Sequence, residues 1–136
     1  MTTESDPVTY FSRLEPEECW ALLSEAQVGR IAWHDGAGIS VVPVNFRVYD
    51  GTVVFHTSAT STLARLVDGH DVSFQVEDID HETAVGWSVL IRGRSAAADE
   101  SIPSVSWLAG DRPVGIAVES TRIDGRVVSG TKQARS

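Results

Sequence analysis

Hydroxyl, imidazole and guanidinium groups gather in one short stretch of the chain, where their types and spacing could bind an anion. His56 and Thr57 end an apolar run, and Ser61, Thr62 and Arg65 follow them. Ser61 and Thr62 precede apolar residues at helical spacing, so they should open a short helix whose free N–H groups favour an anion. Arg65, one turn further on, could reach the same anion. A phosphate site is one interpretation, and a plain N-cap next to a strand end is the other.

An amide and two indoles are the other groups that could contact a ligand ring. Asn45 lies between Val44 and Phe46 in a β pattern, where its amide could donate to a ring or satisfy a neighbouring bulge. Trp87 and Trp107 could flank a ring or serve as core or interface aromatics, and the interface role is favoured. The residues alone leave both alternatives open.

The sequence gives little support for a metal site, for cysteine chemistry or for a nucleotide-binding loop. The acidic stretch around Asp78, Asp80, His81 and Glu82 lacks the spacing of a calcium loop and is expected to form a solvated turn, so no metal site is predicted. Cys19 is the only cysteine, which excludes an intramolecular disulfide. Nucleophile elbows, Walker loops and dinucleotide fingerprints are absent from the sequence. Any redox chemistry must therefore come from a cofactor.

Length and charge narrow the class of protein further. The 136 residues suit one domain, with 1–13 as an N-terminal arm, 14–130 as the domain and 131–136 as a tail. A formal net charge of −8 disfavours nucleic acid and anionic membranes as partners. The first ten residues contain no Lys or Arg and no apolar core, unlike a signal peptide, so a cytoplasmic location is expected.

The elements that would position these residues are mostly strands. An amphipathic helix of about three turns is expected to begin near Glu15, with Cys19 and Leu23 on its apolar face. β-Branched and aromatic runs separated by Gly-containing turns predict about six strands, at 29–34, 39–49, 52–57, 71–78, 86–98 and 113–130. The last run should bend at Asp124-Gly125. Tight turns imply antiparallel pairing and favour a closed or half-closed barrel with two or more short helices.

Alternation within two of these strands separates a core face from a mixed face. Between 39 and 49 the core face holds Val42, Val44, Phe46 and Val48. Between 86 and 98, Trp87, Val89 and Ile91 alternate with Ser88, Leu90, Arg92 and Arg94. The two arginines are expected to pair with the acidic surplus.

Four segments together resemble the pyridoxamine 5'-phosphate oxidase-like FMN-binding split-barrel family. They read LSEAQVGRIAW, VVPVNFRVYDGTVVFHT, SATSTLARL and VSFQVEDIDHETAVGWSVLIRGRS, and the match spans roughly residues 14 to 96. The resemblance implies a mainly β, six-stranded antiparallel split barrel. It also implies a homodimer with two equivalent cofactor sites across the subunit interface, each with a flavin ring on strand backbone and a phosphate near the short helix. The residues it implies for cofactor binding are Pro43, Val44, Asn45, His56, Thr57, Ser61, Thr62, Arg65 and Trp87.

One departure from the family pattern bears on the cofactor. The family commonly has Gly-Ser-Lys where this chain has Thr60-Ser61-Thr62, and the missing lysine would help neutralise the cofactor phosphate. Arg65 or Arg47 could substitute for it. FMN is the expected cofactor, with a deazaflavin coenzyme as the alternative.

The resemblance implies a flavin- or deazaflavin-dependent oxidoreductase acting on an unknown small molecule, in which the cofactor carries the hydride chemistry. No catalytic residue is identified. The alternative is a non-catalytic module that binds a flavin or has lost it. Oxidation of pyridoxamine phosphate itself is disfavoured, because Arg122 and Arg126 alone are a thin signal for a substrate phosphate.

Overall fold

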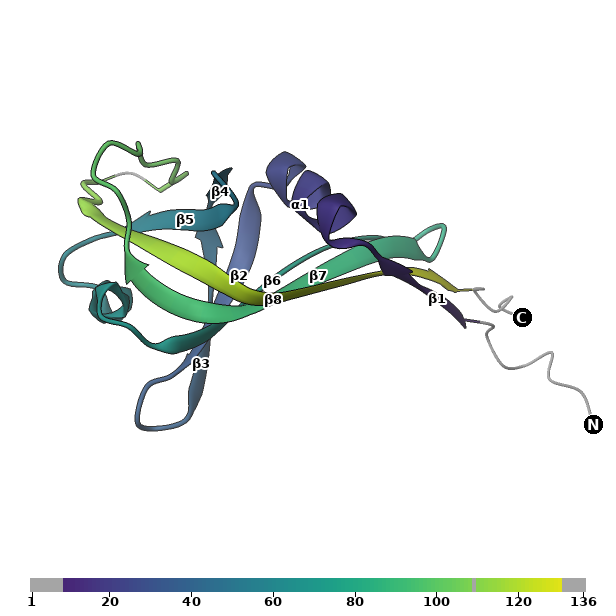
Figure 1. The fold of residues 1–136 in the computed structure, drawn as a ribbon, viewed down its shortest axis with the longest axis horizontal. Helices are drawn as coiled ribbons and strands as arrows, with labels where there is room; N and C mark the ends of the chain where they lie inside the picture. The colour runs from purple at the N-terminus through teal and green to yellow at the C-terminus, as the bar shows by residue number, and fades with distance from the viewer. Residues whose placement is uncertain (1–8, 109, 131–136) are drawn as a thin grey trace, which may run out of the picture.

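The computed structural model describes residues 9–108 and 110–130, which form one curled antiparallel sheet with two helical segments (Figure 1). The expected mainly β split-barrel architecture with few helices is confirmed. The elements are β1 (Thr9–Leu14), α1 (Pro16–Glu25), β2 (Val28–His34), β3 (Ile39–Asn45), β4 (Arg47–Tyr49), β5 (Thr52–Thr57), the 3₁₀ helix η1 (Thr62–Val67), β6 (Asp71–Asp80), β7 (Val85–Ala97) and β8 (Val114–Gly130).

The strand order is β3-β2-β6-β7-β8-β5-β4, with β1 also paired to β8. Every pairing among these strands is antiparallel. The two ends of the order, β3 and β4, are separated in sequence only by Phe46, so the sheet must curl back on itself. Figure 1 shows this curled part at the left and a long β7–β8–β1 extension at the right.

The long strand β8 differs from its expected form. The sequence predicts a bend at Asp124-Gly125, but these residues lie inside the strand, opposite Leu90 and Val89 of β7. The irregularity falls instead between Arg92 and Gly93, where Thr121 is the extra residue of a bulge and its hydroxyl donates to the Arg92 carbonyl at 3.0 Å. Partner strands on both edges of β8 therefore override the local turn signal.

Strand β1 is also absent from the sequence prediction, which expects ordered structure to begin near Glu15. Its Thr9–Leu14 backbone pairs with Gly125–Gly130 of β8. Residues 9–14 show no side-chain periodicity that would predict a strand. They form one because their backbone groups pair with β8. With the division of the 39–49 run at Phe46, this addition raises the number of described strands from the expected six to eight.

The core lies between the concave face of the sheet, α1 and η1. Its largest fully buried side chains include Phe55, Phe74, Leu23, Ile31 and Leu66. The predicted helix is confirmed: it begins with Pro16 in its first turn and a capping box between Glu15 and Glu18, and it buries Cys19 and Leu23. Figure 1 shows α1 across one face of the sheet and η1 at the far end of the curled part.

The predicted core faces are confirmed. In the 39–49 run Phe46 is buried and Val42, Val44 and Val48 pack against the core. In β7, Val89 and Ile91 are buried while Arg92 and Arg94 are exposed. A smaller cluster of Val54, Ala117, Ile102 and Ala98 covers the opposite face of β5 and β8.

Among the described residues, no helix is both long enough and apolar enough to cross a membrane.

Candidate functional site

The predicted anion stretch connects the end of β5 to η1. The Ser61 N–H donates to the Ser58 carbonyl at 3.1 Å, and the Ser61 hydroxyl caps η1 by accepting from the Leu63 N–H at 3.1 Å. Thr62 and Arg65 are exposed, whereas Leu63 is buried. The expected helix opening is confirmed, and it leaves one hydroxyl and one guanidinium directed to solvent.

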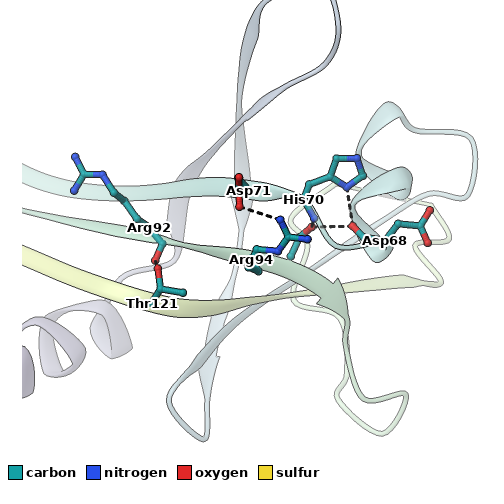
Figure 2. Close-up of polar contacts among 7 residues, drawn as sticks. Asp68, His70, Asp71, Arg92, Arg94 and Thr121 are labelled. Carbon is teal, nitrogen blue, oxygen red and sulfur yellow. Dashed lines mark hydrogen bonds and ion pairs between the residues drawn. The ribbon is translucent and has the colours of Figure 1, made fainter.

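A hydrogen-bonded link anchors η1 to β7 (Figure 2). The Ser95 hydroxyl donates to the Asp68 carbonyl at 3.1 Å and accepts from the His70 N–H at 3.1 Å. The His70 ring nitrogen Nδ1 lies 2.7 Å from the same Asp68 carbonyl. Because Ser95 is buried, this link holds the end of η1 in place against the sheet.

His56 and Thr57 leave β5 on opposite sides. Thr57 is buried, whereas the half-buried His56 ring packs on Gly115 of β8 and faces the Ala98–Ile102 side of the sheet. Burial lowers the pKa of His56, and the charge of Arg47 adds to the decrease, while the Ile102 backbone partly opposes it. The lowered pKa favours the neutral imidazole. Because successive residues of a strand point to opposite faces, the His56 ring and the Thr57 side chain lie on opposite faces of β5.

The amide of Asn45 is engaged by the chain itself. Its Oδ1 accepts from the Trp107 N–H at 2.7 Å, and its Nδ2 donates to the Gln27 carbonyl at 3.4 Å. The amide therefore ties the loop that carries Trp107 to the end of β3. The sequence leaves two roles open for this amide: donation to a ligand ring, or satisfaction of backbone groups near a bulge. The observed hydrogen bonds resemble the second role more closely.

Trp87 lies far from η1 within one chain. It packs against the core near the start of β7, and Ser95, which anchors η1, comes eight residues later. At about 3.3 Å per residue this separation is about 26 Å. Trp87 and Trp107 instead line a separate hollow of about 410 Å³ together with Glu25, Glu77 and Asp78.

Pro43 and Val44 lie on opposite faces of β3. Val44 packs against the core, and Pro43 is exposed on the outer face, by which we mean the sheet face opposite the core. Strand register places Pro43 opposite Arg30 of β2, which is opposite Gln75 of β6. The row continues through Leu90 of β7 to Asp124 of β8.

This row leads to a hollow of about 690 Å³ on the outer face of β7, β8 and β1. Four arginines line it, namely Arg13, Arg92, Arg122 and Arg126, and Asp124 is the carboxylate among its lining residues. We call these residues the arginine face. From the sequence, Arg122 and Arg126 alone are a thin signal for a substrate phosphate, and the register of β7, β8 and β1 adds Arg92 and Arg13 beside them.

The sole cysteine has no features of a reactive thiol. Cys19 is buried on α1, and burial, followed by the charges of Glu18 and Asp124, raises the pKa of its thiol. Its sulfur also lies 2.5 Å from the position that a Cβ at Gly125 would take. The residue serves packing between α1 and β8.

The acidic stretch is divided between β6, which includes Asp78 and Asp80, and the β6–β7 turn, which includes His81 and Glu82. Asp80 Oδ1 accepts from the N–H groups of Glu82 and Thr83 at 2.8 and 3.2 Å, which is the Asx-turn arrangement. In the part of the chain that the structure describes, no group of three or more His, Cys, Asp or Glu side chains converges as metal ligands would.

Comparison with known proteins agrees with this fold and with the sequence resemblance. A 31% identical relative is the uncharacterized protein Rv0080 of Mycobacterium tuberculosis, aligned over 85 residues. That alignment covers 59% of this chain and 56% of Rv0080, so the chain spans about half the length of its relative.

Two solved structures are also similar. An FAD-binding protein from Mycobacterium smegmatis has a TM-score of 0.70 and 29% identity, covering 87% of this chain and 98% of that protein. An FAD-binding protein from Mesorhizobium loti has a TM-score of 0.73 at 18% identity, covering 90% and 99% of the two chains, and this likeness concerns the fold.

The fold and these neighbours define the class: a split-barrel protein whose structural neighbours bind flavins. The pyridoxamine 5'-phosphate oxidase family model matches residues 15–109. The chain belongs to this family.

Proposed function

We propose that this protein is a homodimeric, cytoplasmic flavin-binding protein that holds its cofactor across the subunit interface and transfers electrons to a small molecule. Family membership together with the FAD-binding neighbour from M. smegmatis, which the chain matches over 98% of its length, is the observation that carries the proposal. FMN and a deazaflavin coenzyme are the candidates from sequence, and that neighbour adds FAD.

The donor groups present suit a phosphate-bearing cofactor. Thr62 and Arg65 direct a hydroxyl and a guanidinium to solvent at the exposed start of η1, where they would hold a phosphate. Pro43 and the backbone beside it would lie against the ring. A bound flavin would supply hydride transfer, so these residues need only bind and orient it.

The separation of Trp87 from η1 supports a site shared between subunits. A side chain about 26 Å along the sheet cannot contact a ligand bound at η1 of its own chain. In the proposed dimer, Trp87 of one subunit would contact the cofactor held by η1 of the other.

The absorbance spectrum of the purified protein, followed by titration with FMN, FAD and deazaflavin coenzyme, tests the cofactor. We expect saturable binding of one of them, weakened about tenfold by Arg65→Gln through loss of a charge-assisted hydrogen bond. The charge-matched control is Arg94→Gln. The Arg94 guanidinium lies close to Gly69, just after η1, but is held by Asp71 at 3.0 Å, so this variant tests whether loss of any nearby cation has the same effect. Failure of all three ligands to bind would contradict the proposal.

A non-catalytic carrier is the second candidate. The neighbours from M. smegmatis and M. loti are both described as binding proteins, and the lysine of the family pattern is missing here. Reduction of an artificial electron acceptor by the loaded protein separates the candidates. A carrier would bind the cofactor without accelerating electron transfer above the rate of free reduced cofactor.

A further inference from the structure

Two polar side chains on the outer face of β4 and β5 contain buried nitrogen atoms without a hydrogen-bond partner among the described residues. These atoms are Nε of Arg47 and Nδ1 of His56. Buried polar groups of folded proteins are nearly always hydrogen-bonded, so each of these atoms indicates a missing partner. Both side chains are only half-buried, and part of each can therefore be reached from solvent.

Strand register places the two side chains next to each other. Arg47 of β4 lies directly opposite Val54 of β5, and Val54 and His56 point to the same face because they are two residues apart. Arg47 and His56 are therefore diagonal neighbours, a relation in which the residues are about 7–8 Å apart. The charge of Arg47 acts on the His56 ring, which agrees with this placement.

The loop that follows β7 lies over this part of the outer face (Figure 1). Ile102 is buried against Val54, and its backbone contacts the His56 ring. Because this contact raises the pKa of His56, the ring donates in it, and it does so through Nε2, since Nδ1 has no partner. The loop is held a second time where the Trp107 N–H donates to Asn45.

The positive charge of Arg47 has no counter-charge. Among the described residues, no carboxylate forms an ion pair with its guanidinium, whereas Arg94 is paired with Asp71 at 3.0 Å. In the loop, Asp99 accepts instead from the N–H and the hydroxyl of Ser101, at 2.8 and 2.7 Å. A half-buried guanidinium without a carboxylate favours the binding of an anion from solution.

We propose that Arg47 and His56 together bind the carboxylate group of a small acid. One oxygen would accept from Nε of Arg47 and the other from Nδ1 of His56. With hydrogen bonds of about 2.8 Å on each side, a carboxylate can bridge two groups at this separation. A phosphate dianion has further acceptors that these two donors would leave unpaired, so a carboxylate is the better match.

Binding in this way takes up a proton. The Nε2 atom of His56 already donates to Ile102, so the ring must be protonated on both nitrogens before Nδ1 can donate to a ligand. A bound carboxylate would therefore stabilise the imidazolium, while Arg47 alone disfavours it. The protonation of His56 thus reports directly on occupancy of the pair.

The pair is separate from the groups proposed to hold the flavin. Thr62 and Arg65 belong to η1, whereas Arg47 and His56 belong to β4 and β5. The inference requires no flavin and goes beyond the proposed function. Since the family resemblance includes His56 among the cofactor-binding residues, the experiment must distinguish a free acid from the cofactor.

The pKa of His56, followed by NMR of the full chain in sodium acetate and in sodium chloride at equal ionic strength, tests the proposal. Acetate should raise this pKa by about one unit relative to chloride, which corresponds to about tenfold tighter binding to the protonated form. Acetamide, which is similar in shape but uncharged, should not change it. Equal values in acetate and chloride would overturn the proposal.

Three substitutions separate the hydrogen bond from the charge. Arg47→Gln removes both, so it should raise the pKa of His56 without ligand and weaken acetate binding about tenfold. Arg47→Lys keeps the charge but lacks Nε, so it should keep the lowered pKa and still weaken acetate binding. Arg13→Gln, a charge-matched control on β1, should change neither property. Equal weakening by Arg13→Gln and Arg47→Gln would indicate only general charge attraction and would contradict the proposal.

Further titrations identify the occupant. If inorganic phosphate raises the pKa of His56 more than acetate does at equal ionic strength, the pair is a phosphate site and the proposal is wrong. If the protein saturated with a flavin no longer responds to acetate, the pair belongs to the cofactor site and the proposal is again wrong. If acetate binds and no flavin does, this inference stands and the proposed function fails.

Discussion

At the scale of single residues, polar side chains that are neighbours in the sequence have different surroundings in the fold. His56 and Thr57 are neighbours, but one faces the Ala98–Ile102 side of the sheet and the other is buried. Asn45 is engaged by Trp107 and Gln27. Arg92 and Arg94 both pair with acidic groups as predicted, yet only Arg92 has another arginine opposite it.

His56 should make stability depend on pH. Its pKa in the folded chain lies below the ordinary value of 6.5 because burial disfavours the charged ring. Below pH 6.5 the unfolded chain therefore binds more protons than the folded chain, so this stabilising contribution is complete above pH 6.5 and declines as the pH falls.

Unfolding temperatures of wild type and His56→Gln, measured between pH 8 and pH 5.5, check this expectation. The wild type should lose more stability on acidification than the variant, and the difference at pH 8 corrects for changed packing. Parallel declines in the two proteins would show that His56 does not contribute.

Asn45→Leu should free the loop that carries Trp107. It removes the acceptor of the Trp107 N–H and leaves the Gln27 carbonyl without its side-chain donor. We expect a loss of about 1 kcal/mol in the free energy of unfolding. Trp107 is already 68% exposed, so the emission maximum should move little while quenching by acrylamide rises. Unchanged quenching would argue against this anchor.

At the scale of elements, β8 organises the molecule. It pairs with β7 along its length, with β5 over its first part and with β1 over its last. The bulge at Thr121 lets both halves keep their core faces, and Gly93 lies opposite it. A Cβ at Gly93 would clash with the Glu119 carbonyl oxygen.

Gly93→Ala should therefore destabilise the fold by about 1–3 kcal/mol, because the obstacle is backbone that cannot move aside cheaply. Gly69→Ala is the matched control. The Cβ that it adds meets only the end of the flexible Arg94 side chain, at 2.8 Å. Chemical denaturation of both variants measures the difference, and equal stabilities would refute the backbone explanation.

At the scale of the whole molecule, the residues predicted to bind the cofactor do not all lie together in one chain. Trp87 and η1 lie at opposite ends of the sheet, and exposed apolar side chains follow the outer face of β3, with Ile39 at 75% and Val41 at 56%. These features are consistent with a second subunit that covers β3 and completes the cofactor site.

Light scattering should accordingly give a mass of twice the 14.7 kDa chain at micromolar concentration. Val41→Glu, which places a charge on the exposed part of β3, should shift the population toward monomer, and flavin affinity should fall with it. Glu100→Gln is a control on an exposed residue outside the sheet. A monomeric wild type that still binds flavin would rule out the shared site.

The sequence by itself determined the class of fold, the two helical segments, the core faces of the 39–49 run and β7, and the cap at Ser61. These follow from local periodicity and turn chemistry, which act over a few residues. It could not determine that Thr9–Leu14 is a strand or that Asp124-Gly125 continues one, because strand edges satisfied by distant partners override local signals. Only the tertiary structure decided which residues meet: register across β7, β8 and β1 gathered four arginines from three separate segments, and alternation in β5 parted His56 from Thr57. Cross-strand neighbours depend on pairings between residues as far apart in sequence as Thr9 and Gly130, and no local pattern encodes them.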